Sequence, residues 1–516
     1  GTTFIMILLF IIAVVAIIIM DYVNRKKWFA LRDELGLDGP KPHLFFGNMG
    51  TFFEVIKEKG IQATGTIYPM LREKYGDIYG LYLGSNLEII TTDPEIIKEV
   101  FITQFGNFVD RKQISINMVY PLLDGLLQVD HKGTMGSGWK EQRSVITNIF
   151  SSGKMKKMHG MFHDQLDDLI EEMRKKSRVN EGCMDVYGEY QAMTMDMIAR
   201  CALGQTISCI KDRTNDFYIY ARRFFSHVSY NKSIVFRLSL FFPFFKYLRP
   251  YTTFGKAEKV LLKQLSDIIR QRQAQRAAGQ IRELPDIIDL ILIENEKRLH
   301  NGDDPLHHDV IVSNAWALFL AGYETTSTAL GYASHLLAAY PEAQETLYEE
   351  ILSAFGKSEP IDYERVMKLP YLHAVFCETL RIRPPVITLT GRRCIKETVI
   401  GGKIRVPVGV SVATPVHAMM WNEKYYDEPD KFIPERFLDE NKPKWSPTYM
   451  PFGIGPRNCV GARFAEMEFK TVLAEVTRRF VTMPDPAHKK LETMTSNVLL
   501  TPINNEVFVK LVERNN

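Results

Sequence analysis

One cysteine stands in a sequence context that favours a charged sulfur. Residues 451–461 read PFGIGPRNCVG, and a helix is expected to begin at about Ala462, just after Cys459. The glycines and prolines predict an irregular loop, and Gly461 allows a close approach by another group. Backbone N–H groups near a helix start can donate to the sulfur, and Arg457 adds positive potential. These features favour a thiolate at Cys459 over a thiol.

Two other roles for such a sulfur would each need partner residues. A nucleophilic cysteine needs a neighbouring base, and no partner for this role is visible in the sequence around Cys459. A zinc ligand needs further Cys or His residues at ligand spacing, which are also missing. The other five cysteines carry no paired spacing and are expected to be reduced thiols in a reducing compartment.

A long apolar segment, residues 313–340, contains polar groups where an ordinary buried helix would have none. Gly322, Glu324 and Thr325 interrupt it within the string AGYETT. A carboxylate and a hydroxyl with access to water are the groups that proton relay requires. The alternative is a buried helix that tolerates a few polar side chains.

Two further spacings place charged groups on single helix faces. Glu378 and Arg381 lie three residues apart in an amphipathic stretch that ends at Pro384, and the alternative reading is a surface ion pair of little energetic value. Trp139 and Arg143 lie four apart, and the alternative there is a solvated helix face, which suits the intervening Lys140 and Glu141.

The string Phe452-x-x-Gly455-x-Arg457-x-Cys459-x-Gly461 resembles the heme-loop signature of the cytochrome P450 family. The resemblance extends over essentially the whole chain. It implies that Cys459 is the axial ligand of the iron of heme b (iron protoporphyrin IX), with Phe452 in the cofactor-binding loop. A thiolate ligand donates electron density that favours cleavage of the O–O bond. Residues 107–111 and 360–363 are similar to the animal microsomal branch that includes drug and steroid hydroxylases.

The resemblance also implies roles for the other segments. Gly322 would make room for dioxygen, and Glu324 and Thr325 would deliver protons during oxygen activation. Residues expected at the heme propionates are Trp139, Arg143, Arg457, Arg111 and Arg392. Residues expected to form a buried structural charge network beneath the heme are Glu378, Arg381 and Arg436.

The implied activity is that of a monooxygenase, which inserts one atom of dioxygen into a lipophilic substrate such as a xenobiotic, a steroid or a fatty acid. No flavin or nicotinamide domain is visible, so electrons are expected from NADPH-cytochrome P450 reductase, with cytochrome b5 as a further donor. Positive potential for docking is expected from Lys140, Arg463 and Lys470. Two alternatives stay open: an isomerase or synthase that rearranges peroxides, and a non-catalytic sensor of heme or lipophiles.

Composition sets broader limits. The formal net charge is +3, from 64 basic and 61 acidic residues, which gives no reason to expect a nucleic-acid partner. Strand-like runs at residues 76–92 and 398–414 flank a long helical region. The expected fold is therefore mainly α with a small β-region, in one large heme-thiolate domain over residues 43–516.

The first residues predict a membrane anchor. Residues 4–20 are all apolar and would span about 25 Å as a helix, so an anchor is expected at 4–23. Arg25, Lys26 and Lys27 follow, and residues 24–42 form a basic stop and a proline-containing linker. The positive-inside rule then puts the catalytic domain in the cytoplasm, on the endoplasmic-reticulum membrane. A cleaved signal peptide is the alternative.

Three further segments have residues with more than one interpretation. Residues 233–251 are strongly apolar, and either burial or a shallow insertion into membrane lipid would explain them. His307, His308 and Asp309 look like a metal cluster but are expected to cap a helix. Residues expected to line the substrate pocket are Phe108, Ile114, Phe319 and Ile387.

Overall fold

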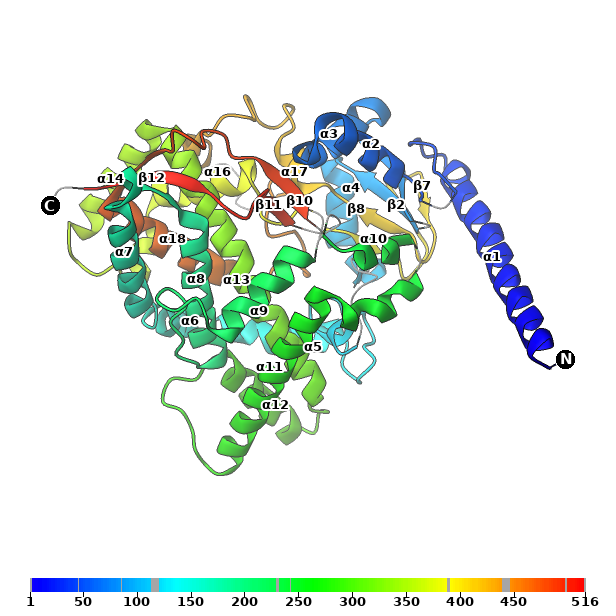
Figure 1. The fold of residues 1–516 in the computed structure, drawn as a ribbon, viewed down its shortest axis with the longest axis horizontal. Helices are drawn as coiled ribbons and strands as arrows, with labels where there is room; N and C mark the ends of the chain where they lie inside the picture. Colours follow the sequence, from blue (N-terminus) through cyan, green and yellow to red (C-terminus); the bar gives the residue numbers. More distant parts are fainter. Residues whose placement is uncertain are drawn as a thin grey trace.

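The computed structural model describes residues 2–44, 46–84, 86–112, 120–228, 232–241, 243–387, 390–438, 446–496 and 499–514. Helices dominate the body, as the sequence predicts, and a smaller β-region lies to one side, near the C-terminal end of α1 (Figure 1). The helices before the central one are α1 (Thr2–Glu34), α2 (Met49–Lys59), α3 (Ile67–Tyr75), α4 (Pro94–Lys98), α5 (Trp139–Thr147), α6 (Ser152–His159), α7 (His163–Ser177), α8 (Val186–Ile198), α9 (Asp216–His227), α10 (Ile234–Phe241), α11 (Thr253–Ala277) and α12 (Ile287–His300). The remaining helices are α13 (His308–Ala339), α14 (Pro341–Phe355), α15 (Tyr363–Lys368), α16 (Pro370–Ile382), α17 (Val416–Met420) and α18 (Ala462–Arg479).

The strands form a five-stranded sheet and three smaller ones. The five-stranded sheet has the order β1-β2-β8-β5-β3, in which β2 (Asn86–Thr91) pairs antiparallel with β1 (Ile78–Leu83) and parallel with β8 (Ser411–Ala413). Its other strands are β5 (Arg392–Arg393) and β3 (Asp110–Arg111). The smaller sheets are β4 (Cys183–Asp185) with β12 (Phe508–Glu513) and β9 (Phe480–Pro484), β10 (Thr493–Ser496) with β11 (Leu499–Pro502), and β6 (Thr398–Ile400) with β7 (Ile404–Val406).

Local sequence signals account for several of these elements. The first strand-like run folds into the β1–β2 hairpin, and the second supplies β6, β7 and β8. Asp93 caps α4 by accepting a hydrogen bond from the Glu95 amide at 2.8 Å. The expected helix after the cysteine loop is α18, which begins at Ala462. These predictions are confirmed.

The core is organised around α13, whose side chains are buried on nearly every face. It packs against α8, α11, α16 and α18, and Figure 1 shows it crossing the middle of the body. A helix that is apolar all round belongs in the interior, which explains the long greasy stretch in the sequence. His307 caps α13 by accepting from the Asp309 amide, so the expectation of a cap is confirmed. No group of three metal-ligating side chains occurs among the described residues.

The first helix extends away from the body (Figure 1). A membrane-spanning helix, judged by length and apolar character, is not found in the described part of the chain. Most side chains of residues 4–18, on which the predicted anchor depends, lie outside what the structure describes. Domain boundaries at residues 23 and 42 therefore stay predictions.

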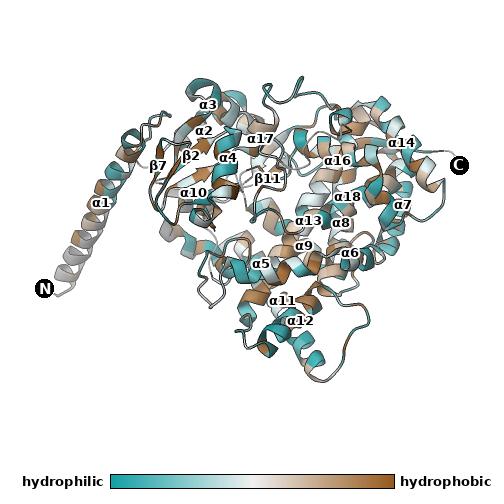
Figure 2. Ribbon diagram, turned by 180° about the vertical axis from the view of Figure 1, so that it is seen from behind, coloured by the Kyte–Doolittle hydropathy of each residue, from teal (hydrophilic) through white to brown (hydrophobic). Residues whose placement is uncertain are grey.

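The apolar segment 233–251 combines buried and exposed side chains. It forms α10 and the 3-10 helix η8 (Pro243–Tyr251). Phe236 is buried, whereas Ile234, Tyr247 and Tyr251 are 62%, 69% and 77% exposed. In Figure 2 the surroundings of α10 and β2 are coloured as hydrophobic. Burial alone therefore does not account for this segment.

Glu378 and Arg381 form a charge network inside the protein rather than a surface ion pair. Both are fully buried, and Arg381 Nε and Nη2 donate to the two Glu378 carboxylate oxygens at 2.7 and 2.8 Å. Arg436 Nε donates to Glu378 Oε1 at 3.3 Å. Arg381 also donates to the carbonyls of Met420, Pro429 and Lys431, which fixes the segment after α17 against α16.

Replacing Glu378 with alanine is expected to lower the free energy of unfolding by about 3–5 kcal/mol, because Arg381 is left as an unpaired buried charge. Chemical denaturation followed by circular dichroism measures this change. The matched control is Asp267→Ala, which removes an exposed ion pair with Lys263 and should cost less than about 1 kcal/mol. Equal losses in the two variants would contradict a structural role for the buried network.

Candidate active site

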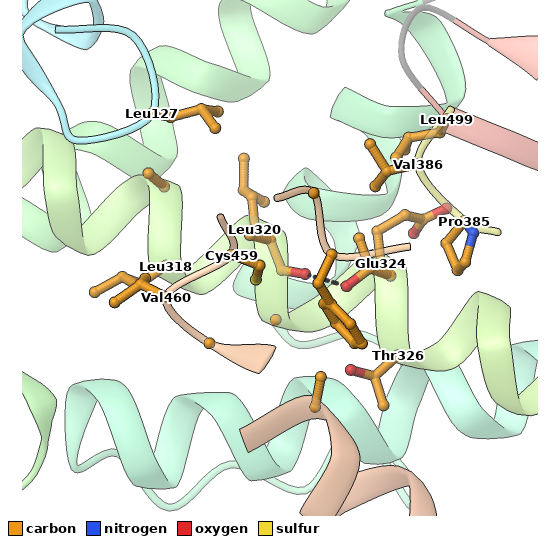
Figure 3. Close-up of a pocket in the computed structure, with 18 of the residues that line it drawn as sticks. Leu127, Leu318, Leu320, Glu324, Thr326, Pro385, Val386, Cys459, Val460 and Leu499 are labelled. Carbon is orange, nitrogen blue, oxygen red and sulfur yellow. Dashed lines mark hydrogen bonds between the residues drawn. The ribbon is translucent and has the colours of Figure 1, made fainter. Parts of the chain in front are cut away.

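A cavity of about 360 Å³ lies between α13, the end of α16 and the loop that precedes α18. Most of its wall is apolar, and Figure 3 shows Leu127, Leu318, Leu320, Val386 and Leu499 around it. Cys459 lines the same cavity. A large apolar cavity with a few polar groups is the usual form of a site for a lipophilic molecule.

The cysteine loop is held by tight backbone contacts. The Cys459 amide donates to the Phe452 carbonyl at 2.8 Å. Gly455 has a φ of +77°, and a side chain there would begin 1.9 Å from the Phe101 carbonyl oxygen, so glycine is required. Cys459 is exposed, and it lines the cavity. Phe452, predicted in the cofactor-binding loop, also lines the cavity.

Burial and hydrogen bonding have opposite effects on this sulfur. Loss of solvent raises the pKa of Cys459, and the Gly461 amide and the charges of Arg143 and Arg111 lower it. Burial has the larger effect, so the net pKa lies above that of an ordinary thiol. The local environment alone therefore does not create a free thiolate. A metal ion bound to the sulfur would do so, because a coordinating thiol is deprotonated.

Four arginines gather beside Cys459, and all four line the cavity: Arg111, Arg143, Arg392 and Arg457. Their hydrogen bonds go mainly to backbone carbonyls. Arg457 donates to Val109 O at 2.7 Å and to Val129 O at 2.6 Å, and Arg111 donates to Arg457 O at 3.0 Å. Arg143 donates to the Asn458 carbonyl and side-chain oxygens at 2.7 and 2.8 Å. Trp139 packs beneath the Arg457 guanidinium, 5.4 Å from its ring centre.

This arginine cluster carries more positive charge than the protein around it compensates. No carboxylate in the described chain forms an ion pair with any of the four. The Nε atoms of Arg111, Arg392 and Arg457 are buried without a hydrogen-bond partner in the described structure. Burial and mutual repulsion lower the pKa of Arg457 to about 8. Burial lowers the pKa of Arg111 to about 10, and burial also lowers the pKa of Arg392.

Unmatched buried cations are costly unless an anion joins them. The residues present therefore fit a ligand with two carboxylates at the arginines and an iron atom at the sulfur. Heme b has this combination of groups. Trp139, Arg143, Arg457, Arg111 and Arg392 would hold its propionates, and Cys459 would hold its iron.

The α13 residues predicted for proton relay divide between two faces. Thr325 lines the cavity and donates from Oγ1 to the Ala321 carbonyl at 2.7 Å. Glu324 also contributes to the cavity wall (Figure 3), but its carboxylate is turned toward α8. Gly322 lines the cavity. A Cβ atom at this position would lie 2.9 Å from Ile198 Cδ1, so the absence of a side chain allows Ile198 to pack against α13 here.

Sequence reasoning missed the two residues that hold Glu324. Tyr187 donates to Glu324 Oε1 at 2.6 Å, and Gln191 Nε2 donates to Oε2 at 3.2 Å. Burial raises the pKa of Glu324, and these two hydrogen bonds lower it by a smaller amount. Both partners lie more than 130 positions before Glu324 in the chain, so no local pattern reveals them.

Several expected residues lie elsewhere. Phe108 and Phe319 are fully buried and Ile387 is 5% exposed, so they belong to the packed core and not to the described cavity lining. Ile114 falls outside the described residues. Lys470, expected on a docking face, is buried and pairs with Glu466 at 2.9 Å, so that prediction is wrong. Lys140 and Arg463 are exposed.

A second buried acid, Glu468 of α18, was also missed. It is fully buried and points toward Thr326 of α13, which lines the cavity. The two side chains face each other without forming a hydrogen bond of standard geometry, and neither carboxylate oxygen has another partner in the described structure. Burial raises the pKa of Glu468 to about 8. Burial, with a smaller contribution from the charge of Glu468, raises the pKa of the Cys201 thiol.

Comparison with known proteins agrees with this geometry. The family model described as Cytochrome P450 matches residues 37–509. Cytochrome P450 3A13 of Mus musculus is 28% identical over 503 residues, which cover 96% of this chain and 95% of the relative. Cytochrome P450 3A40 of Oryzias latipes is 30% identical, covering 86% of both chains. Thromboxane-A synthase of Sus scrofa is 28% identical, covering 98% of this chain and 96% of the relative.

The raised pKa of Glu468 predicts a pH-dependent contribution to stability. The folded protein keeps this proton up to about pH 8, whereas the unfolded chain loses it near the ordinary value of 4.5. The contribution is therefore complete below about pH 4.5 and is lost as pH rises to about 8. Replacing Glu468 with glutamine should raise the free energy of unfolding relative to the unmodified protein, by on the order of 1 kcal/mol per pH unit in this window.

Denaturation curves collected between pH 5 and pH 8 measure this difference. Glu349→Gln, at an exposed position of α14, is the control. A stability difference between the Glu468 variant and the unmodified protein that is constant with pH would contradict the raised pKa.

Proposed function

The chain belongs to the cytochrome P450 family, and we propose that Cys459 is the axial ligand of its heme b iron. The protein is an oxidoreductase, a monooxygenase that inserts one atom of dioxygen into a lipophilic organic substrate. One observation carries the assignment of the site: Cys459 lies in the cavity wall beside four arginines, of which Arg392 and Arg457 are buried, and none of the four forms an ion pair with a carboxylate in the described chain. When bound, heme supplies the oxygen-activating redox chemistry, which a thiolate ligand promotes.

The arginines and Trp139 bind and orient the cofactor in this proposal. Arg457 and Arg111 are fixed by backbone carbonyls on three different segments, so their free N–H groups are already aimed before the cofactor arrives. Arginine suits this role because its planar donors match carboxylate geometry. The propionates would in turn satisfy the Nε groups that have no partner in the described structure.

Proton delivery is assigned to α13. The Thr325 side chain lines the cavity, and its hydroxyl donates a hydrogen bond to the Ala321 carbonyl. The lone pairs of Oγ1 can therefore accept a hydrogen bond from another group. Glu324 holds a carboxyl group one residue away, and its raised pKa increases the fraction protonated at neutral pH. Gly322 allows α8 to approach this part of α13 closely.

The proposal also includes the redox partners that supply electrons to the protein and its attachment to a membrane. NADPH-cytochrome P450 reductase, with cytochrome b5 as a further donor, would dock on the face that carries Lys140 and Arg463, because exposed cations steer an acidic partner. Residues 4–23 would form a single-pass anchor in the endoplasmic-reticulum membrane, with the catalytic domain in the cytoplasm, because the run is apolar and basic residues follow it. The exposed apolar residues of 233–251 would contact membrane lipid.

The sulfur assignment is tested by the absorption spectrum of the reduced, carbon-monoxide-bound protein. The unmodified protein should show the spectrum of a thiolate-ligated heme, and Cys459→Ala should lose it because no other described cysteine lines the cavity. Cys183→Ser, at a strand outside the site, is the control and should keep the spectrum. A thiolate spectrum that survives in Cys459→Ala would refute the assignment.

The role of Thr325 separates monooxygenation from the rearrangement of peroxides. With reductase and NADPH, Thr325→Val should form several-fold less product per NADPH oxidised, because a hydroxyl is lost from the proton path. Thr325→Ser, which keeps the hydroxyl, should restore most of the yield. Product formation from a hydroperoxide alone, unchanged in Thr325→Val, would instead favour an isomerase or synthase.

A further inference from the structure

We propose that Asn314, together with Gln142, is a specificity-determining pair that holds one wall of the substrate cavity in place. The wall is formed by Leu126 and Leu127, which line the cavity, and Figure 3 shows Leu127 beside the same pocket as Leu320 and Cys459. The proposal rests on the proposed function, because it concerns how that cavity selects its substrate.

Asn314 connects the long helix directly to this wall. Its Oδ1 accepts a hydrogen bond from the Leu126 amide at 2.8 Å. Its Nδ2 donates to Gln142 Oε1 at 2.9 Å and to the Val310 carbonyl at 2.9 Å. Both N–H groups of the amide are therefore used within the protein. Although Asn314 lines the cavity, it has no N–H left for a ligand, and its main effect there is on the position of its neighbours.

Gln142 extends the connection to both ends of the wall segment. Its Nε2 donates to the Asp124 carbonyl at 2.7 Å and to the Ser137 carbonyl at 3.1 Å. Asp124 in turn accepts from the Thr134 amide at 2.9 Å and from its hydroxyl. Gln142 and Asn314 are 0% and 1% exposed, so each lost hydrogen bond would leave a buried polar group without a partner.

The wall segment depends on such contacts because it has little regular structure of its own. Between the 3-10 turn η4 (Leu122–Asp124) and the start of α5 at Trp139, the chain forms turns and bends. A side chain at Gly125 would begin 2.6 Å from Ser313 Oγ, so the backbone approaches α13 closely here. Buried backbone groups in an irregular segment need external partners, and Asn314 supplies one at Leu126.

The same segment is tied to the cysteine loop from its other side. Arg457 donates to the Val129 carbonyl at 2.6 Å. Gln142 itself lies on α5, one residue before Arg143. The wall is thus fixed between α13 and the arginine cluster. Loss of the Asn314 contacts should allow Leu126 and Leu127 to change position relative to the substrate. The Cys459 sulfur and Arg457 should stay in place.

Two measurements test the pair in the full-length, heme-loaded protein. In Asn314→Ala, hydrogen–deuterium exchange of the peptides covering residues 122–138 should become faster, because their anchor on α13 is lost. Binding of clotrimazole, followed by the heme absorption change, should weaken about tenfold, the equivalent of about 1.4 kcal/mol. Binding of imidazole should stay unchanged, because this small ligand does not reach the wall. A general loss of stability would weaken both ligands alike.

Matched variants make the test specific. Ser334→Ala removes another buried hydrogen bond between α13 and a neighbouring helix, the 2.8 Å contact with Tyr190, and should leave both measurements unchanged. Gln142→Ala should reproduce the Asn314→Ala effects, and the double variant should be no worse than either single one, because both changes break one network. If Asn314→Ala does not fold, Gln142→Ala carries the same predictions.

The outcomes are distinguishable. Unchanged exchange in residues 122–138, or equal weakening of clotrimazole and imidazole, would overturn the role of the pair. Additive effects in the double variant would also overturn it. If neither azole changes the heme spectrum of the unmodified protein, the proposed function fails, and the exchange measurement still reports on the wall by itself.

Discussion

The structure depends above all on a concentration of buried positive charge beside one sulfur. Arg111, Arg143, Arg392 and Arg457 donate to backbone carbonyls, which orient them but do not neutralise them. Arg392 and Arg457 are buried, and buried guanidinium groups without carboxylate partners among the described residues are unfavourable by themselves. A ligand with two carboxylates would reverse this balance, so binding of heme at the proposed site would stabilise the folded form of this region. The segments that these arginines join are the cysteine loop, the wall segment and the β-region.

Two buried acids near the cavity, Glu324 and Glu468, differ from the arginine cluster in how the protein accommodates them. Glu324 and Glu468 are fully enclosed, and burial raises the pKa of both. A carboxyl group that retains its proton can donate as well as accept, which an ion-paired carboxylate cannot do. Glu378 shows the opposite arrangement, because Arg381 and Arg436 both donate hydrogen bonds to it in a structural network. Glu324 and Glu468 thus differ from Glu378 in that no arginine forms an ion pair with them among the described residues.

Sequence reasoning located the elements better than the contacts between them. The hairpin of β1 and β2, the cap at Asp93 and the start of α18 follow from local patterns, because a turn, a cap or a helix start depends on neighbouring residues. Tyr187 and Gln142 could not be found in this way, since their partners are distant in sequence. Lys470 was misplaced because its charge suggested the surface, whereas Glu466 pairs with it inside. The positions of Phe108 and Phe319 depended on packing, which apolarity alone does not specify.

Overall identity does not by itself separate the activities found among the relatives. Cytochrome P450 3A13 and thromboxane-A synthase are each 28% identical to this chain over almost its whole length. The discriminating features are therefore individual groups at the cavity. A rearrangement that needs no external protons has no use for a hydroxyl and an acid next to each other on α13. This chain has both, and α8 contributes Tyr187 and Gln191 to hold the acid. Building such a network into the core has a cost in buried polar groups, and the proposed proton delivery would give that cost a purpose.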